Sequence, residues 1–178
     1  MNVDSNESGF TLIEVSVAMV LLLIGAVALA GGVALGARRL TGSQDQFLAS
    51  ERAAEAAESV FKARDNRIIT WAQIRNKFGA SGNDNGIFLD GAKDVRAAGN
   101  DGLVNTTDDG AIEEIIRPGN DGMLGTADDT HTPIYGMTRE IEIRDLSSTL
   151  RQLRVIVRYK TPTGTAQYVL TTYISAYA

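Results

Sequence analysis

The distribution of apolar residues predicts a long helix at the start of the chain. No charged residue occurs from Val15 to Ala37, and this run is longer than the roughly 20 residues with which an α-helix crosses a hydrocarbon core. A helix satisfies its own backbone hydrogen bonds, so it can span lipid. We predict one helix from about Thr11 to about Arg64, frayed near residues 41–43, whose first half is compatible with a membrane.

Beyond Arg39 the pattern becomes amphipathic. One stripe of a helix surface would carry the apolar residues Phe47, Ala54, Ala57 and Phe61. This half is expected to form the spine against which the rest of the chain packs. Further apolar residues occur at Ile68, Ile69, Trp71, Ile74 and Phe78. They suggest a short second helix with Thr70 as its cap.

From Met137 apolar and polar residues alternate, which is typical of β-strands with one buried face. The alternation covers residues 137–144, 153–160 and 168–174, and turn-forming residues lie at 145–149 and 161–164. The pattern predicts a three-stranded antiparallel meander over residues 137–177, with one face on the helix. The fold class is therefore α+β: a long N-terminal helix, a small antiparallel sheet and a long loop region rich in aspartate and glycine.

That loop region, residues 79–132, contains an internal repeat. Gly99-Asn100-Asp101-Gly102 recurs as Gly119-Asn120-Asp121-Gly122, and in each copy an apolar pair and then Thr-x-Asp-Asp follow. A loop of this length without secondary structure needs an explanation in a compact domain.

Calcium binding is one explanation of the repeat. Calcium takes roughly six to eight oxygen ligands, in loops that glycine allows to turn sharply. The candidate ligands are Asp101, Asp108 and Asp109 in the first copy and Asp121, Asp128 and Asp129 in the second. The spacing is not that of an EF-hand. The alternative is a pair of solvated turns, because Asn-Asp-Gly is also favourable turn chemistry.

Composition and charge exclude some classes of function. The net charge of −5 argues against a nucleic-acid binder that works through its overall charge. Cysteine is absent, which rules out disulfides, thiolate zinc sites and a cysteine nucleophile. The single histidine, His131, reads as a solvated loop residue, and no nucleophile–base pair is visible, so we predict that the protein is not an enzyme. Four basic strand residues are expected on a solvated face, with DNA, lipid headgroups or an acidic neighbouring subunit as alternative contacts: Arg151, Arg154, Arg158 and Lys160.

One carboxylate, that of Glu14, lies at the head of the apolar run. A carboxylate at the centre of a bilayer costs about 2.5 kcal/mol or more. Glu14 avoids this cost if it lies near the membrane interface or if it finds a partner. The segment Gly9-Phe10-Thr11-Leu12-Ile13-Glu14-Val15 resembles the processing site of type IV prepilins and type II secretion pseudopilins. The resemblance implies that a membrane aspartyl peptidase cuts between Gly9 and Phe10 and methylates the new N-terminal amine. It also implies that Glu14 faces the N-terminal amine of a neighbouring subunit in a filament.

The same resemblance implies an organisation and a location. Residues 1–9 would be a leader peptide, residues 10–38 a transmembrane and filament-core helix, and residues 39–178 a globular pilin domain. The chain would sit in the bacterial inner membrane as a single-pass protein with a periplasmic C-terminal domain, and then in a surface pilus or a periplasmic pseudopilus. Its expected partners are other pilin or pseudopilin subunits, prepilin peptidase and the inner membrane, with no nucleic acid. Two features depart from the family: the leader has no Lys or Arg, and Arg38-Arg39 favour a cytoplasmic C-terminal side by the positive-inside rule.

The C-terminal strands also resemble those of minor pilins of the PilV type and of I-type minor pseudopilins. We therefore predict a minor pilin of a type IV pilus, with a minor pseudopilin of a type II secretion system as the alternative. A membrane-anchored calcium-dependent adhesin that never polymerises is a further alternative. An anchored hydrolase that uses the Asp-rich loops has the least support, since no nucleophile–base pair accompanies them.

Overall fold

The computed structural model describes residues 11–79, 84–162 and 164–177, with the backbone alone at residue 35 and residues 37–43. The chain divides into two compact units, Met1–Gly42 and Ser43–Ala178. We describe each unit separately.

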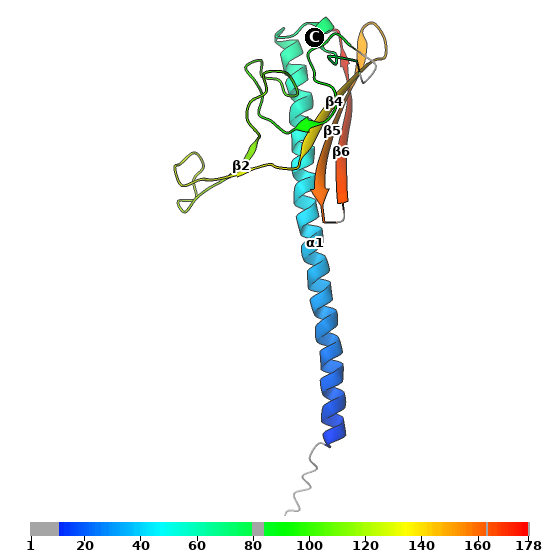
Figure 1. Cartoon of the computed structure of the whole chain (residues 1–178), viewed down its shortest axis with the longest axis vertical. Coiled ribbons are helices and arrows are strands. Elements are labelled where there is room, and N and C mark those ends of the chain that lie inside the picture. The colour runs from blue at the N-terminus through cyan, green and yellow to red at the C-terminus, as the bar shows by residue number, and fades with distance from the viewer. Residues whose placement is uncertain (1–10, 80–83, 163, 178) are drawn as a thin grey trace, which may run out of the picture. The chain divides into compact units, whose positions relative to one another are not determined.

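The N-terminal unit holds the first part of helix α1, which runs from Leu12 to Asp65 over 54 residues (Figure 1). The long predicted helix is confirmed. The stretch Leu12–Ala34 has a mean hydropathy of 2.6 and is long and apolar enough to cross a membrane. The backbone stays helical through residues 41–43, so the predicted fraying is not seen there.

The second unit is built on an antiparallel sheet of strand order β1-β4-β5-β6. The strands are β1 (Lys93–Asp94), β4 (Thr138–Asp145), β5 (Leu150–Thr161) and β6 (Gly164–Ser175). The last three form the predicted meander, and the two-residue strand β1 adds to its β4 edge. The α+β fold class is therefore confirmed.

The sheet packs on a face of α1 that is made almost entirely of alanine. The buried residues of the helix are Ala49, Ala53, Ala56, Ala57, Val60 and Ala63. The predicted stripe is wrong for most of its members, because Phe47 and Ala54 are exposed and Phe61 is only half-buried. The sheet supplies the large side chains of the core, among them Ile141 and Val155. Small helix residues let the sheet approach closely, so the bulky residue of the stripe lies outside the contact.

The predicted second helix is one turn of 3₁₀ helix, η1 (Trp71–Gln73). Its start is closed as expected, because the backbone N–H of Thr70 donates to Oε1 of Gln73 at 2.8 Å. Ile74 follows the turn and is fully buried. Ile69 and Ile74 therefore anchor a turn to the core rather than a helix, while Ile68 and Phe78 are exposed.

The basic strand residues divide between the interior and the surface. Arg151 was expected on a solvated face, but it is 2 % exposed, and its guanidinium lies 4.0 Å from the centre of the Trp71 ring and pairs with Asp145 at 2.6 Å. The prediction is wrong because Arg151 lies on the core side of β5, as its position in the two-residue alternation requires. Arg154 and Arg158, on the other face, pair with Glu142 and Glu140 at 2.8 and 2.7 Å.

The loop region is less irregular than its composition indicates. It contains β1 and a two-stranded antiparallel ribbon of β2 (Glu114–Arg117) and β3 (Thr130–Pro133) that projects from the body of the unit (Figure 1). It also contributes fully buried core residues, including Phe88 and Val95. The predicted loop region therefore takes part in the core over this stretch and contains secondary structure of its own.

Candidate functional site

The start of α1 is closed by a reciprocal pair of hydrogen bonds. The backbone N–H of Thr11 donates to Oε2 of Glu14 at 2.9 Å, and the backbone N–H of Glu14 donates to Oγ1 of Thr11 at 3.3 Å. This is a capping box, which satisfies two of the amide groups that the first helical turn leaves without partners. Sequence reasoning missed the part played by Thr11, although the Thr-x-x-Glu spacing is the signal for it.

Glu14 is exposed in the first turn of the helix. In the part of the chain that the structure describes, its carboxylate bonds to Thr11 and to no cation. Gly9 and Phe10, the predicted processing residues, lie outside the described residues. A cation for Glu14 would therefore have to come from outside the described chain.

The two copies of the repeat fold in the same way. We call residues 99–109 the first loop and residues 119–129 the second loop. In the first loop the Leu103 N–H donates to Oδ1 of Asp101 at 2.8 Å, and in the second the Met123 N–H donates to Oδ1 of Asp121 at the same distance. The carboxylates thus hold their own backbone turns, which is the alternative that the sequence left open.

A second contact recurs at the other end of each loop. Oγ1 of Thr106 donates to Oδ1 of Asp108 at 2.8 Å, and Oγ1 of Thr126 donates to Oδ1 of Asp128 at 2.7 Å. These hydroxyl groups, with backbone N–H groups, lower the pKa of both aspartates.

The first glycine of each copy is required because an aspartate side chain of the same loop lies directly against its backbone. A Cβ atom on Gly99 or on Gly119 would lie 2.3 Å from the carboxyl carbon of the aspartate that closes the loop. Such a contact cannot form, so a side chain at either position would displace the aspartate. The Gly-Asn-Asp-Gly signature therefore encodes the shape of the loop.

A metal site is not preformed in either loop. Among the described residues, no three His, Asp or Glu side chains converge on a point that could hold a metal ion. Asp109 accepts the backbone N–H groups of Asn105 and Thr106 at 2.9 and 3.0 Å, so its two oxygens face the chain. Calcium binding at the six aspartates stays a prediction that rests on the sequence.

The loops differ in what covers their apolar pairs. Leu103 and Val104 of the first loop are 0 % and 4 % exposed, whereas Met123 and Leu124 of the second loop are 63 % and 65 % exposed. The first loop is packed into the core, and the second forms the tip of the β2–β3 ribbon.

One residue difference accompanies this difference in burial. Asn105 of the first loop and Gly125 of the second occupy equivalent positions, and both have positive φ, +59° and +88°. The side chain of Asn105 donates to the carbonyl oxygen of Arg139 and accepts from its Nε, each at 2.8 Å. Glycine cannot make either contact, so the second loop lacks the anchor that ties the first loop to β4.

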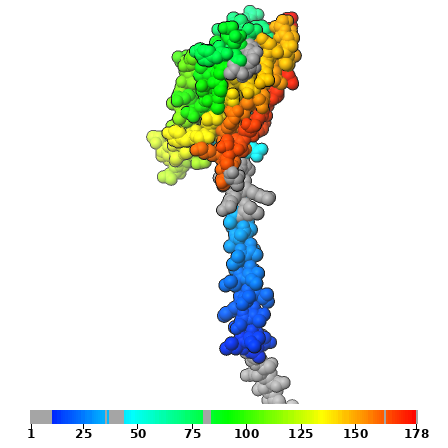
Figure 2. All heavy atoms as spheres, turned by 45° about the vertical axis from the view of Figure 1, so that its right-hand side comes forward, coloured from blue at the N-terminus to red at the C-terminus, as the bar shows by residue number. Residues whose placement is uncertain are grey.

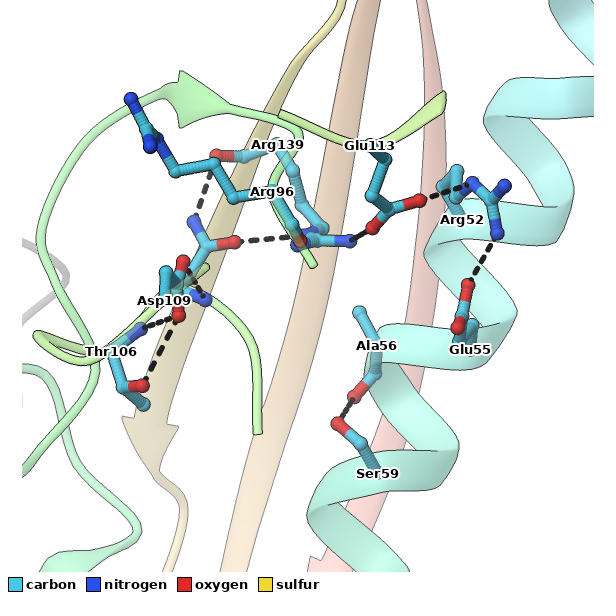
Figure 3. A network of polar contacts seen from close by, with 10 residues as sticks. Arg52, Glu55, Ala56, Ser59, Arg96, Thr106, Asp109, Glu113 and Arg139 are labelled. Carbon is cyan, nitrogen blue, oxygen red and sulfur yellow. Dashed lines mark hydrogen bonds and ion pairs between the residues drawn. The ribbon is translucent and has the colours of Figure 1, made fainter. Parts of the chain in front are cut away.

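This anchor belongs to a buried polar network that joins the loop region, the sheet and α1 (Figure 3). Arg139 is fully buried, and its Nη2 donates to the carbonyl oxygen of Arg96 at 2.9 Å. Its Nη1 lies 3.5 Å from Oε1 of Glu113, whose other oxygen pairs with Nε of Arg52 on α1 at 2.7 Å. Burial raises the pKa of Glu113 and lowers the pKa of Arg139.

The two loops provide a matched test of burial. We expect Leu103→Ala to lower the free energy of unfolding by about 2–5 kcal/mol, because it leaves a cavity in the core. Met123→Ala, at the equivalent exposed position, should stay within about 0.5 kcal/mol. Denaturant titration of the full chain in detergent, followed by the fluorescence of the single tryptophan, Trp71, measures both. Equal losses for the two variants would contradict the difference in packing.

If the loops bind calcium, the chain should melt at a higher temperature in calcium than in chelator. Binding to the folded state alone adds about 2.7 kcal/mol at a hundredfold excess of ligand over Kd. Asp109→Ala and Asp129→Ala should each remove part of the gain, and magnesium should substitute poorly because it needs tighter octahedral geometry. Titration calorimetry is the second measurement. No heat and no change in melting temperature would identify both loops as plain turns.

Comparison with known proteins gives one match. Residues 4–30 match the model of the prokaryotic N-terminal methylation motif. No curated protein and no solved structure matches the chain. The chain therefore carries the signal of type IV prepilins and pseudopilins, as the sequence predicted. The matched region is a pilin-type motif and not part of an enzyme family. Together with the apolar helix found among the described residues, it fits membrane anchoring.

Proposed function

We propose that the protein is a minor pilin, a structural subunit of a type IV pilus. The observation that carries the proposal is the prepilin signal at the head of an apolar helix long enough to cross a membrane. The antiparallel sheet on the second half of that helix supports a pilin-type subunit. The subunit would sit in the inner membrane with its sheet unit in the periplasm before it enters the filament.

The predicted partners follow from this assignment. Prepilin peptidase would cut between Gly9 and Phe10, and other pilin subunits would surround the mature helix. The carboxylate of Glu14 would then pair with the N-terminal amine of a neighbour, which is the cation that the described chain does not supply.

A minor pseudopilin of a type II secretion system is the second candidate, because the same N-terminal signal serves both classes. Recovery of the chain in sheared surface filaments favours the pilus, and its recovery in a periplasmic assembly favours the secretion system. A chain that is processed but found in neither assembly would favour a membrane-anchored adhesin.

Processing is the direct test of the proposal. We expect mass spectrometry of membrane-extracted protein to show a chain that begins at methylated Phe10. Gly9→Leu should abolish the cut, because the peptidase must approach the backbone closely at that residue, while Gly9→Ala should be tolerated better. Recovery of an intact Met1 terminus from cells with an active prepilin peptidase would exclude the assignment.

A further inference from the structure

The two edges of the main sheet are treated differently. At the β4 edge, Asn76 donates from Nδ2 to the carbonyl oxygen of Ile141 and accepts the N–H of Ile143, each at 2.8 Å. Asn105 bonds the carbonyl oxygen of Arg139 in the same way, and β1 pairs with the start of the strand. Two fully buried asparagines thus take the place of a neighbouring strand along this edge.

The β6 edge is open over the part of the chain that the structure describes. β6 has 12 residues and pairs with β5 alone, in an uninterrupted register from Gly164 to Ser175. Every second residue of such a strand directs its N–H and C=O away from its partner. A contact to this strand from outside the hairpin is made by Arg64, which donates to the carbonyl oxygen of Ser175 at 3.0 Å.

The sequence of β6 lacks the features with which edge strands avoid pairing. From Gly164 to Ala178 there is no charged residue and no proline, and valine, leucine, isoleucine, threonine and tyrosine predominate. Natural edge strands are usually protected by charge, proline, bulges or short length. A long, regular and neutral edge is a template for an added strand.

The same chain has a projecting element that lacks a covering layer. We define the arm as β2, β3 and the second loop, residues 114–133. Its strands are mostly exposed, and β2 pairs with β3 alone among the described strands. A two-stranded ribbon is marginally stable by itself in water. The exposed pair Met123 and Leu124 at its tip corresponds to the pair that the first loop buries, so the arm carries an apolar surface that lacks its cover.

We propose that β2 of the arm pairs with the open edge of β6 in a second copy of this chain, antiparallel to it. The arm and β6 lie on opposite sides of the globular unit (Figures 1 and 2), so one copy can present its arm to one neighbour and its edge to another. The contact joins two different surfaces, so it repeats from subunit to subunit rather than closing into a dimer. The proposal rests on the proposed function, because it needs neighbouring copies.

The distribution of charge supports the arm of a second copy as the partner of β6, and it supports the antiparallel direction of β2. The second loop carries Asp121, Asp128 and Asp129 and no basic residue. An antiparallel β2 would bring it toward the Gly164 end of β6, where the exposed Lys160 of β5, one strand in from the edge, pairs with Thr165. The side chain of Lys160 lies against Gly136 on the β4 side, so it would turn toward β6 to meet the acidic tip, and the neutral strand between adds no repulsion.

Single cysteines test the contact without background, because the natural chain has none. Two full-length copies with different tags are produced together in the same membrane. One carries Ile116→Cys or Arg117→Cys on β2, whose side chains point to opposite faces, and the other carries Gln167→Cys or Val169→Cys on β6. Mild oxidation should give a disulfide between the two tags for at least one combination. Ser148→Cys, in the turn between β4 and β5, should give none with the arm cysteines.

Lys160→Glu should strongly reduce the mixed disulfide, whereas Lys160→Arg should preserve it. Absence of the disulfide in every combination would overturn the proposal. Disulfides between two copies of the same β6 variant alone would also overturn it, because they show β6 paired with itself. Mass spectrometry of the N-terminus on the same samples separates the two hypotheses: a chain that begins at Phe10 but does not crosslink refutes the arm contact alone, and an unprocessed chain refutes the proposed function.

Discussion

Arg139→Ala is expected to lower the free energy of unfolding by about 3–5 kcal/mol, since it breaks a buried charge network by removing one partner. The substitution removes the Nε–H that Asn105 accepts, although the bond from Asn105 to the backbone carbonyl oxygen of residue 139 can remain. It also leaves Glu113 with Arg52 alone. Glu113 is itself largely buried, so the lost partner is not replaced by water. Denaturant titration followed by Trp71 fluorescence gives the loss.

Arg154→Ala is the matched control for this prediction. Arg154 is also an arginine of the sheet paired with a glutamate, at 2.8 Å, but its side chain is 37 % exposed. Exposed pairs contribute about 0–1 kcal/mol, so the control should lose no more than that. If Arg139→Ala and Arg154→Ala cost the same, the buried network does not hold the loop region to the sheet.

Glu14→Val is expected to abolish or greatly reduce entry into the filament while leaving the globular unit folded. Valine suits an apolar helix better than a carboxylate does, so membrane insertion should continue. Assembly should fail because the N-terminal amine of the neighbouring subunit loses its anion. The measurement is the ratio of subunit in sheared filaments to subunit in the membrane.

Glu14→Gln separates the two roles of this residue. Glutamine can still accept the N–H of Thr11 and keep the capping box closed, but it carries no charge. If charge pairing drives assembly, Glu14→Gln should fail as Glu14→Val does. Normal assembly of Glu14→Gln would assign the defect of Glu14→Val to the helix start, and normal assembly of both would exclude the pairing.

The elements whose sequences show a clear pattern of apolar residues were predictable. The apolar run up to Ala37 predicts a helix, and the alternation after Met137 predicts strands. Both are present. The buried face of α1 was not predictable from apolarity alone. Phe47 and Ala54 satisfied the helix spacing, but the side chains of the sheet already fill the core, so the contact selects alanines and leaves Phe47 exposed.

The residues of the candidate site could be predicted from the sequence, but the burial of each loop could not. The repeat identified the two loops and their six aspartates, and the structure gives both loops the same hydrogen bonds. Nothing in the repeat indicates that one loop lies in the core and the other does not. That difference depends on contacts far away in sequence, such as the one between Asn105 and Arg139.

The unequal burial of the two loops has a consequence for how the chain can change over generations. Substitutions at Leu103 or Asn105 alter the stability of the whole unit, so selection on folding acts on them directly. Substitutions at Met123 or Gly125 leave the core untouched. Selection on the core therefore leaves the apolar pair of the second loop freer than that of the first, and among descendants of this chain we expect more variation at Met123 and Leu124 than at Leu103 and Val104.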